Sequence, residues 1–212
     1  MFAAFALVAS THFAALLSPG PDFFLLIRAA LLRGRRHADG CAAGISLANL
    51  ASMLLVLFVL GLLPEVASHG LRVVQLLGGG YFVWLGTQAL LARRKLEIPT
   101  AGGNHKAGGF LRGVREGFLA SSLNPKLPIF YAGLFGVLGQ FHLPAWALGA
   151  CVLWMGAVVL LWDMALVRLL DRPRWRGWLK RRVTALDRIC GGLLLALGGW
   201  LLWSGLLWSG LR

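Results

Sequence analysis

The sequence predicts an all-α integral membrane protein of six transmembrane helices, built as two inverted three-helix repeats. Of its 212 residues, 58% are hydrophobic and only 14% are charged, against roughly 25% charged residues in an ordinary soluble domain. The mean hydropathy is +0.73. Six runs carry no charge or a single charge, and each reaches the ~20 residues that cross a ~30 Å hydrocarbon layer. These runs are 1–27, 41–63, 73–92, 117–143, 144–167 and 189–211.

Positive charges fall in alternate loops between these runs. The formal net charge is +13, and of the 21 Lys and Arg residues four lie in 28–36, six in 93–115 and eight in 168–188. Because cytoplasmic loops carry an excess of Lys and Arg, these three loops are predicted to be cytoplasmic, with both termini outside. A basic chain can also bind nucleic acid. Here the Lys and Arg residues lie next to apolar runs, which favours membrane lipids as partners of this protein. We expect it to bind no nucleic acid.

The first apolar run is interrupted by "LLSPGPDFF" at 16–24. A proline removes one backbone donor and clashes with the carbonyl four residues earlier, so Pro19 and Pro21 each free a carbonyl. An unpaired polar group within hydrocarbon costs several kcal/mol, so the break must face protein, water or a ligand. We therefore expect a broken helix that lines a binding site with Ser18, Pro19, Gly20, Pro21 and Asp22.

The second and third runs carry polar and small residues that suit helix packing. Asn49 in the second run and Gln75 in the third are secondary polar candidates, and Asn49 fits a simple interhelical hydrogen bond. The third run contains "LLGGGYFVWLG", whose glycines allow two helices to approach closely. We expect these glycines to form contacts within the chain, and a homodimer seam is the alternative.

The stretch 93–112 is predicted to be a cytoplasmic linker between a first half, 1–92, and a second half, 113–212. It begins "RRKLEIPTAGGNHKAGG", a composition typical of flexible connections. Since each half holds an odd number of spans, the second half must enter the membrane in the opposite orientation. This arrangement is the inverted-topology repeat of many transporters.

The fourth run is interrupted by "SLNPKLP" at 122–128, at the position in the second half that matches the first break. Two breaks at matched positions point to a substrate site near the bilayer midplane. A charge at the centre of a spanning helix costs roughly 2.5–3.5 kcal/mol, so a lysine here needs a reason. The alternatives are that Asp22 and Lys126 reach water at the helix ends, or pair with each other. The expected binding residues of this break are Ser122, Asn124, Pro125 and Lys126.

The remaining runs add candidates for proton coupling. Asp163 lies within "VVLLWDMALV" in the fifth run, and a local ion pair with Arg168 is the alternative use of its charge. Asp22 and Asp163 are the proton-coupling candidates. His12 is a further candidate for a proton relay, although a lone histidine in a helix more commonly makes a simple hydrogen bond. In the last run, Trp203 fits an aromatic belt at the outer interface.

The backbone and side-chain groups at the two breaks suit the binding of a small zwitterion. Half-helix N-termini present free N–H groups and a positive dipole end to a carboxylate. Freed carbonyls and an aspartate suit an ammonium group or a proton. The same parts would also bind a metal cation, so export of a metal cation is one alternative. That activity would require a cluster of carboxylate, His or Cys ligands, and the sequence contains none.

No cofactor, metal centre or enzymatic activity is predicted. Cys41, Cys151 and Cys190 lie in different segments without a C-x-x-C pair, which argues against a thiol–disulfide carrier, the alternative from another class. Hydrolase and metalloprotease motifs such as G-x-S-x-G and H-E-x-x-H are absent. A purely structural subunit would leave two prolines and two opposite charges in mid-membrane without a reason.

The sequence resembles the LysE family, in the branch of homoserine and threonine efflux proteins, and is most similar to the threonine efflux type. The motifs that carry this resemblance span nearly the whole chain in the expected order. They are "SPGPDFF" at 18–24, "RGRRHADG" at 33–40, "GGGYFVWLGTQALL" at 78–91, "SLNPK" at 122–126 and "ALDRICGGLLLALG" at 185–198.

The resemblance implies an exporter of small amino acids in the bacterial inner membrane, driven by proton antiport with alternating access. One three-helix half would then rock against the other around the site at the two breaks. Asp163 matches an acidic residue in the fifth helix of some relatives. Two departures stand out: many relatives carry an aspartate where this chain has Asn49, and Pro128 is unusual. An asparagine cannot carry a proton, which puts a coupling role for the second helix in doubt.

Overall fold

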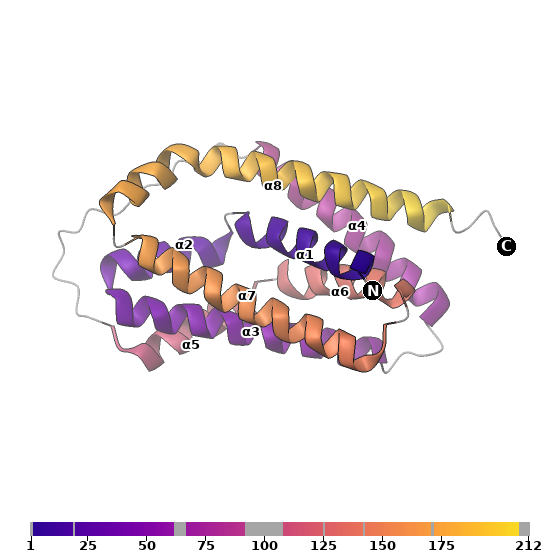
Figure 1. Cartoon of the computed structure of the whole chain (residues 1–212), viewed down its shortest axis with the longest axis horizontal. Coiled ribbons are helices and arrows are strands. Elements are labelled where there is room, and N and C mark those ends of the chain that lie inside the picture. Colours follow the sequence, from indigo (N-terminus) through magenta and orange to yellow (C-terminus); the bar gives the residue numbers. More distant parts are fainter. Residues whose placement is uncertain are drawn as a thin grey trace.

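A computed structural model describes residues 2–18, 20–61, 67–91, 108–124, 126–141, 143–170 and 172–207. Every regular element in these ranges is a helix (Figure 1). In chain order the helices are α1 (Phe2–Leu17), α2 (Pro21–Leu32), α3 (Arg35–Gly61), α4 (Ala67–Leu91), α5 (Phe110–Ser122), α6 (Lys126–Leu138), the short 3₁₀ helix η1 (Gly139–Phe141), α7 (Ala145–Leu170) and α8 (Pro173–Leu207).

Three of these helices are long and apolar enough to cross a membrane: α3, α7 and the Thr184–Leu206 part of α8. The 27 residues of α3 extend over roughly 40 Å at ~1.5 Å per residue. The residues Ala4–Leu17 of α1 and the whole of α2 pass the same test together, as one span bent by 52°. The apolar helices Leu76–Leu91 and α6 are shorter. The chain is therefore an all-helical membrane protein, and the six-span inverted repeat stays a prediction.

Helices end and begin at both proline motifs. Helix α1 ends at Leu17 and α2 begins at Pro21, whereas α5 ends at Ser122 and α6 begins at Lys126. Proline, which has no backbone N–H, suits the first position of a helix, as at Pro21, because an N–H there would have no helical partner. Residues 110–112, at the end of the predicted linker 93–112, belong to α5, whose first residue Phe110 follows the extended backbone of Gly109. Residues 92–107 lie outside the described ranges.

Glycine lets α3 and α5 pack backbone against backbone. Gly40 and Gly44 of α3 face Gly113 and Gly117 of α5, and a methyl group placed on any of the four would overlap backbone atoms of the other helix. Small residues at four-residue spacing are typical of such close crossings in membranes. At one end of this crossing, the Glu116 carboxylate lies 3.2 Å from Arg33 and 3.2 Å from the His37 ring.

A second glycine contact joins α4 to α8. A methyl group on Gly86 would lie 2.7 Å from the carbonyl oxygen of Gly191, and one on Gly198 would lie 2.7 Å from the carbonyl oxygen of Gly79. Gly78 packs directly on Gly133 of α6. The third-run glycines 78, 79 and 86 therefore make contacts within the chain, as expected. The homodimer stays an untested alternative.

The two ends of the helix assembly differ in charge. The α2–α3 turn, the start of α5, the end of α7 and the start of α8 lie at one end, at the left of Figure 1. We call this the basic end, because Arg33, Arg35, Arg112, Arg168 and Arg172 belong to these segments. The start of α1 and the end of α6 lie at the opposite end, which we call the far end (Figure 1).

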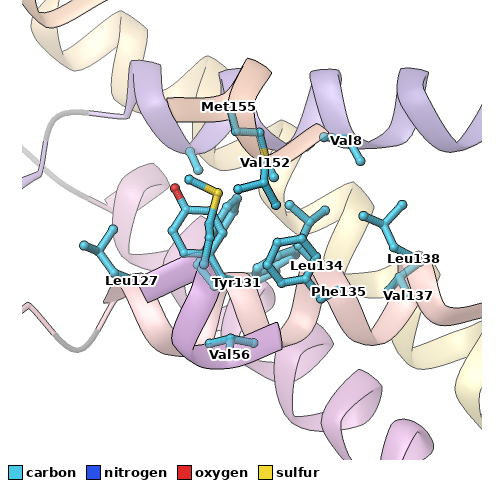
Figure 2. Close-up of a cluster of buried hydrophobic side chains, with 14 of the residues drawn as sticks. Val8, Val56, Leu127, Tyr131, Leu134, Phe135, Val137, Leu138, Val152 and Met155 are labelled. Atoms are coloured by element: carbon cyan, nitrogen blue, oxygen red, sulfur yellow. The ribbon is translucent and has the colours of Figure 1, made fainter. Parts of the chain in front are cut away.

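Buried apolar side chains form two clusters. The basic-end core joins α2, α3 and α7, with Leu26, Ile45 and Val167 among its buried members. The far-end core, shown in Figure 2, includes side chains of α1, α3, α6 and α7, among them Val8 and Leu134. Residues beside the helix breaks belong to both clusters: Phe23 of α2 to the basic-end core, and Ala15 of α1 and Leu127 of α6 to the far-end core.

Candidate functional site

A cavity of about 70 Å³ lies beside the two helix breaks. Because a single buried water needs about 10–15 Å³, the cavity has room for several water molecules or a small polar group. Nine of the residues singled out from the sequence line it: His12, Ser18, Gly20, Pro21, Asp22, Asn49, Asn124, Lys126 and Asp163. The structure thus brings together side chains from both halves of the sequence, over a hundred positions apart.

Four other candidates are not placed in this cavity. Pro19 and Pro125 lie outside the described residues, and so does the side chain of Gln75, although its backbone belongs to α4. Ser122 is exposed at the end of α5 and is not part of the cavity lining. The structure therefore does not place Ser122 in the cavity, and the neighbouring Ser121, which is not part of the lining either, instead contacts the cavity residue Asp22.

Ser121 reaches the site because of its phase on α5. Its side chain is fully buried, and its hydroxyl donates a hydrogen bond to Oδ2 of Asp22 at 3.0 Å. Since α5 is still helical at both serines, consecutive side chains point about 100° apart around its axis. Ser122 therefore points away from Asp22. The pair "SS" alone does not reveal which serine faces inward.

The first break leaves the start of α2 open. Gly20 has an extended backbone (φ −113°, ψ −172°) and provides no side-chain cap for the helix. Pro21 has no N–H, so the free N–H groups of the first turn belong to the residues that follow it. Asp22 lies in this first turn, where the positive end of the helix dipole favours a negative charge.

The second break satisfies its own backbone more completely. The side-chain oxygen of Asn124 accepts a hydrogen bond from the backbone N–H of Lys126 at 3.0 Å, which caps the start of α6. The backbone N–H of Asn124 donates to the carbonyl of Ser121 at 3.0 Å. That carbonyl is the one that Pro125 deprives of its helical donor. The two breaks are therefore different locally: α6 is capped by a side chain and α2 is not.

Lys126 connects the two breaks. Its side chain extends from the start of α6 to the end of α1, where Nζ donates to the carbonyl oxygen of Ala15 at 3.1 Å. A methyl group on Gly20 would lie 3.8 Å from the same Nζ. The lysine ammonium thus lies beside the uncapped start of α2, and the two together make one wall of the cavity electropositive.

Asp163 provides a second carboxylate in the cavity. It lies on α7, its residue is 5% exposed, and its Oδ2 is buried without a hydrogen-bond partner among the described residues. The local pair with Arg168, offered above as the alternative, is not what the structure shows. The guanidinium of Arg168 lies 4.0 Å from Asp39 and donates to the Met164 carbonyl at 3.0 Å.

The far-end wall of the cavity is aromatic. The Tyr131 hydroxyl, on α6, donates to Oδ1 of Asn49 on α3 at 2.7 Å, and both residues are buried. The Asn49 amide donates to the Ile45 carbonyl at 2.9 Å. The ring of His12 lies beside Tyr131 and Phe130, with centroid separations of 6.4 Å in each case. Asn49 thus makes the interhelical hydrogen bond expected of it.

Sequence reasoning missed several residues of this region. Phe130, Tyr131 and Trp162 line the cavity, and a tyrosine within an apolar run could have been singled out because its hydroxyl needs a partner when buried. Outside the cavity lining, Asp187 of α8 was missed as well, although it lies in the quoted motif at 185–198. Its side chain is fully buried, and a buried carboxylate in a spanning helix is by default a candidate for function.

Comparison with known proteins agrees with this architecture. Residues 13–205 match the family model described as LysE type translocator. The chain is 28% identical over 205 residues to the threonine efflux protein of Escherichia coli (strain K12), covering 93% of this chain and 97% of that protein. It is 25% identical over 186 residues to the homoserine/homoserine lactone efflux protein of Salmonella typhi, covering 86% and 87%. No solved structure matches the chain.

Proposed function

The chain belongs to the LysE type translocator family, and we propose that it exports a small neutral or hydroxylated amino acid, such as threonine or homoserine, from the cytoplasm. The similarity to threonine and homoserine efflux proteins over most of their length supports this substrate class. The observation that carries the proposal is the charge arrangement of the cavity. Carboxylates and an ammonium group line the same small space between two helix breaks.

A zwitterion fits this arrangement with each of its charges facing an opposite one. Its carboxylate would lie beside the Lys126 ammonium and the uncapped start of α2 at Gly20. Its ammonium group would face Asp22 and Asp163. Burying one isolated charge in a membrane is expensive. In this cavity, charged side chains of opposite sign would take the place of water at both the carboxylate and the ammonium group of the zwitterion.

The proposed topology places the basic end in the cytoplasm, because Lys and Arg accumulate in cytoplasmic segments. Both termini would then lie outside, on the periplasmic side of a bacterial inner membrane. Within this proposal the chain forms six spans as two inverted three-helix halves, 1–92 and 113–212. The clustering of basic segments at one end of the helices supports it (Figure 1).

We further propose proton antiport with Asp22 and Asp163 as the proton carriers. Both carboxylates line the cavity, and Asp163 is almost fully buried. An ionised carboxylate inside a membrane needs a positive partner, and here either the substrate ammonium or a proton can supply the compensating charge. Exchange of one for the other, in cavities open to alternate sides, couples outward amino-acid movement to inward proton movement.

Efflux from loaded cells that overproduce the protein tests the proposal. Wild type should export threonine or homoserine several-fold above background, and a protonophore should abolish the difference. Asp22→Asn should lower efflux at least about tenfold, because a hydrogen-bonded charge contributes roughly 1.5–3 kcal/mol. Asp39→Asn is the matched control, since Asp39 pairs with Arg35 at 3.8 Å outside the cavity lining. Background efflux by wild type across a panel of amino acids would exclude the substrate class.

A further inference from the structure

The helices sort into two groups that mix the two sequence halves. Helix α3 packs most extensively on α5 and then on α7, and α2 packs on both α3 and α7. Helix α4 packs most extensively on α8 and then on α6, and α1 packs most extensively on α8. We call α2, α3, α5 and α7 bundle A, and α1, α4, α6 and α8 bundle B. Both bundles are visible in Figure 1, with α3 beside α5 and α4 beside α8.

The contacts within each bundle leave little room for sliding. In bundle A, Gly44 and Gly117 bring α3 and α5 into backbone contact, and the Ser46 hydroxyl donates to the Gly156 carbonyl of α7 at 3.0 Å. In bundle B, Gly86 and Gly191 do the same for α4 and α8. Interfaces packed at backbone distance have no flexible side chains that could absorb a displacement. Each bundle is therefore suited to move as a unit.

Each broken helix crosses from one bundle to the other at its break. The chain leaves bundle B at the end of α1 and enters bundle A at Pro21, and it leaves bundle A at Ser122 and enters bundle B at Lys126. The described non-helical residues at the breaks, Ser18, Gly20, Leu123 and Asn124, thus lie where the chain passes from one bundle to the other. The cavity lies between the two bundles, with Asp22 and Asp163 on bundle A and Lys126 on bundle B.

At the far end, the two bundles are closed against each other. The far-end core includes Leu134 and Val8 from bundle B together with Val152 and Met155 from bundle A (Figure 2). Met53 of bundle A is also buried in it. By contrast, the buried members of the basic-end core come from α2, α3 and α7, all in bundle A, and the bundle B side chains that pack against them, Leu16 and Leu186, are only partly buried. The Tyr131–Asn49 hydrogen bond, 2.7 Å long, joins the bundles where this far-end seal meets the cavity.

We propose that Tyr131 and Asn49 are the latch of an outer gate, which opens when bundle B separates from bundle A. The proposal rests on the proposed function for its direction, with the far end outside. It replaces the rocking of one sequence half against the other with the rocking of two mixed bundles. A substrate held between Lys126 and the two aspartates would bridge the bundles, so its binding and release can bias their separation.

Labelling of a cysteine in the cavity tests the latch without requiring knowledge of the substrate. In a chain whose native Cys41, Cys151 and Cys190 are replaced by alanine, Ser18→Cys places a thiol in the cavity lining. A membrane-impermeant thiol reagent added outside intact cells should label it slowly. Tyr131→Phe keeps the ring but removes the hydrogen bond. It should accelerate labelling about two- to tenfold, because the free energy of one hydrogen bond changes the population of the open state by about that factor.

Tyr81→Phe is the matched control, because Tyr81 packs partly buried against the far-end core and stacks on Trp84 of the same helix, but does not line the cavity. It should label at the parent rate. Asn49→Leu removes the same hydrogen bond from the other side, so it should accelerate labelling as Tyr131→Phe does. The double variant should add little to either single change, since both remove one shared interaction.

Equal labelling in Tyr131→Phe, Asn49→Leu and Tyr81→Phe would overturn the latch. Rapid labelling of the parent from outside would overturn the closed far end. These outcomes are separate from the substrate assignment: accelerated labelling in a protein that exports no amino acid would support the latch while the proposed function fails.

Discussion

The ammonium nitrogen of Lys126 lies 3.1 Å from the carbonyl oxygen of Ala15, 111 positions earlier in the chain. Proline at position 19 deprives this carbonyl of its helical donor, and the lysine from the second break supplies a replacement. A charged side chain thus satisfies the backbone of the opposite sequence half inside the membrane. The same nitrogen lies beside the open start of α2, where we place the substrate carboxylate.

Removal of this ammonium group should affect both backbone and substrate. Lys126→Met keeps the length of the side chain and should lower efflux at least about tenfold, because each charged hydrogen bond contributes roughly 1.5–3 kcal/mol and ~1.4 kcal/mol corresponds to a factor of ten. Lys126→Arg should retain measurable efflux. The measurement is initial efflux rate normalised to the amount of protein in the membrane. Wild-type rates in Lys126→Met would exclude a role for this charge.

The two adjacent serines of α5 provide a matched pair. Ser121→Ala removes the hydroxyl that donates to Asp22 at 3.0 Å and should lower efflux about tenfold, since it weakens a hydrogen bond to a charged group. Ser122→Ala changes an exposed side chain outside the cavity lining and should leave efflux unchanged. The reverse order of effects would mean that α5 has a different rotation in the membrane.

Glycine packing between α3 and α5 can be tested by stability. Gly44→Ala forces a methyl group into the backbone of α5 at Val114 and should destabilise the protein by roughly 1–3 kcal/mol, as overpacking does. Gly80→Ala places the same methyl group where no atom beyond the chain neighbours and nearby backbone of its own helix lies within 4 Å. Alanine also favours helix over glycine by about 1 kcal/mol, so Gly80→Ala should be neutral or stabilising. Thermal unfolding of the detergent-solubilised variants compares the two.

The Asp163→Asn variant should distinguish a role in proton coupling from a role in substrate binding. In reconstituted vesicles, Asp163→Asn should still exchange internal for external amino acid, because Asp22 and Lys126 remain in the cavity. Net efflux against a gradient should fall to the level measured without a proton gradient. If Asp163→Asn loses exchange and net efflux equally, the carboxylate binds substrate and the assignment of a coupling role is wrong.

The helix breaks were predictable from the sequence because their cause is local. A proline within a helical run frees the carbonyl four residues earlier, so Pro19 and Pro125 predict the breaks without knowledge of any neighbour. Asp22, Asn124 and Lys126 lie directly beside these prolines, and the structure places all three in the cavity lining. Residues within a few positions of a break are thereby brought to the same place.

The other features of the site and the helix packing depend on contacts between helices that are distant in the sequence. A single sequence does not show which helices make these contacts. Ser121 differs from Ser122 only in its rotation about α5. Tyr131 enters the site because α6 packs against α3, where Asn49 accepts its hydrogen bond. The pairing of α3 with α5 follows from glycines on both helices, and the glycines of either helix alone do not identify the partner. Apolar runs show which segments span, but not which spans move together.

The central claim is that one cavity receives both charges of an amino acid, and ligand binding to the purified full-length protein tests it most directly. Isothermal titration should compare threonine with 1-amino-2-propanol, which lacks the carboxylate, and with N-acetylthreonine, which lacks the ammonium charge. We expect threonine to bind at least about tenfold more tightly than either analogue, because each lost charge leaves a buried partner uncompensated. Equal affinity for threonine and both analogues would contradict a zwitterion site between Lys126 and the two aspartates.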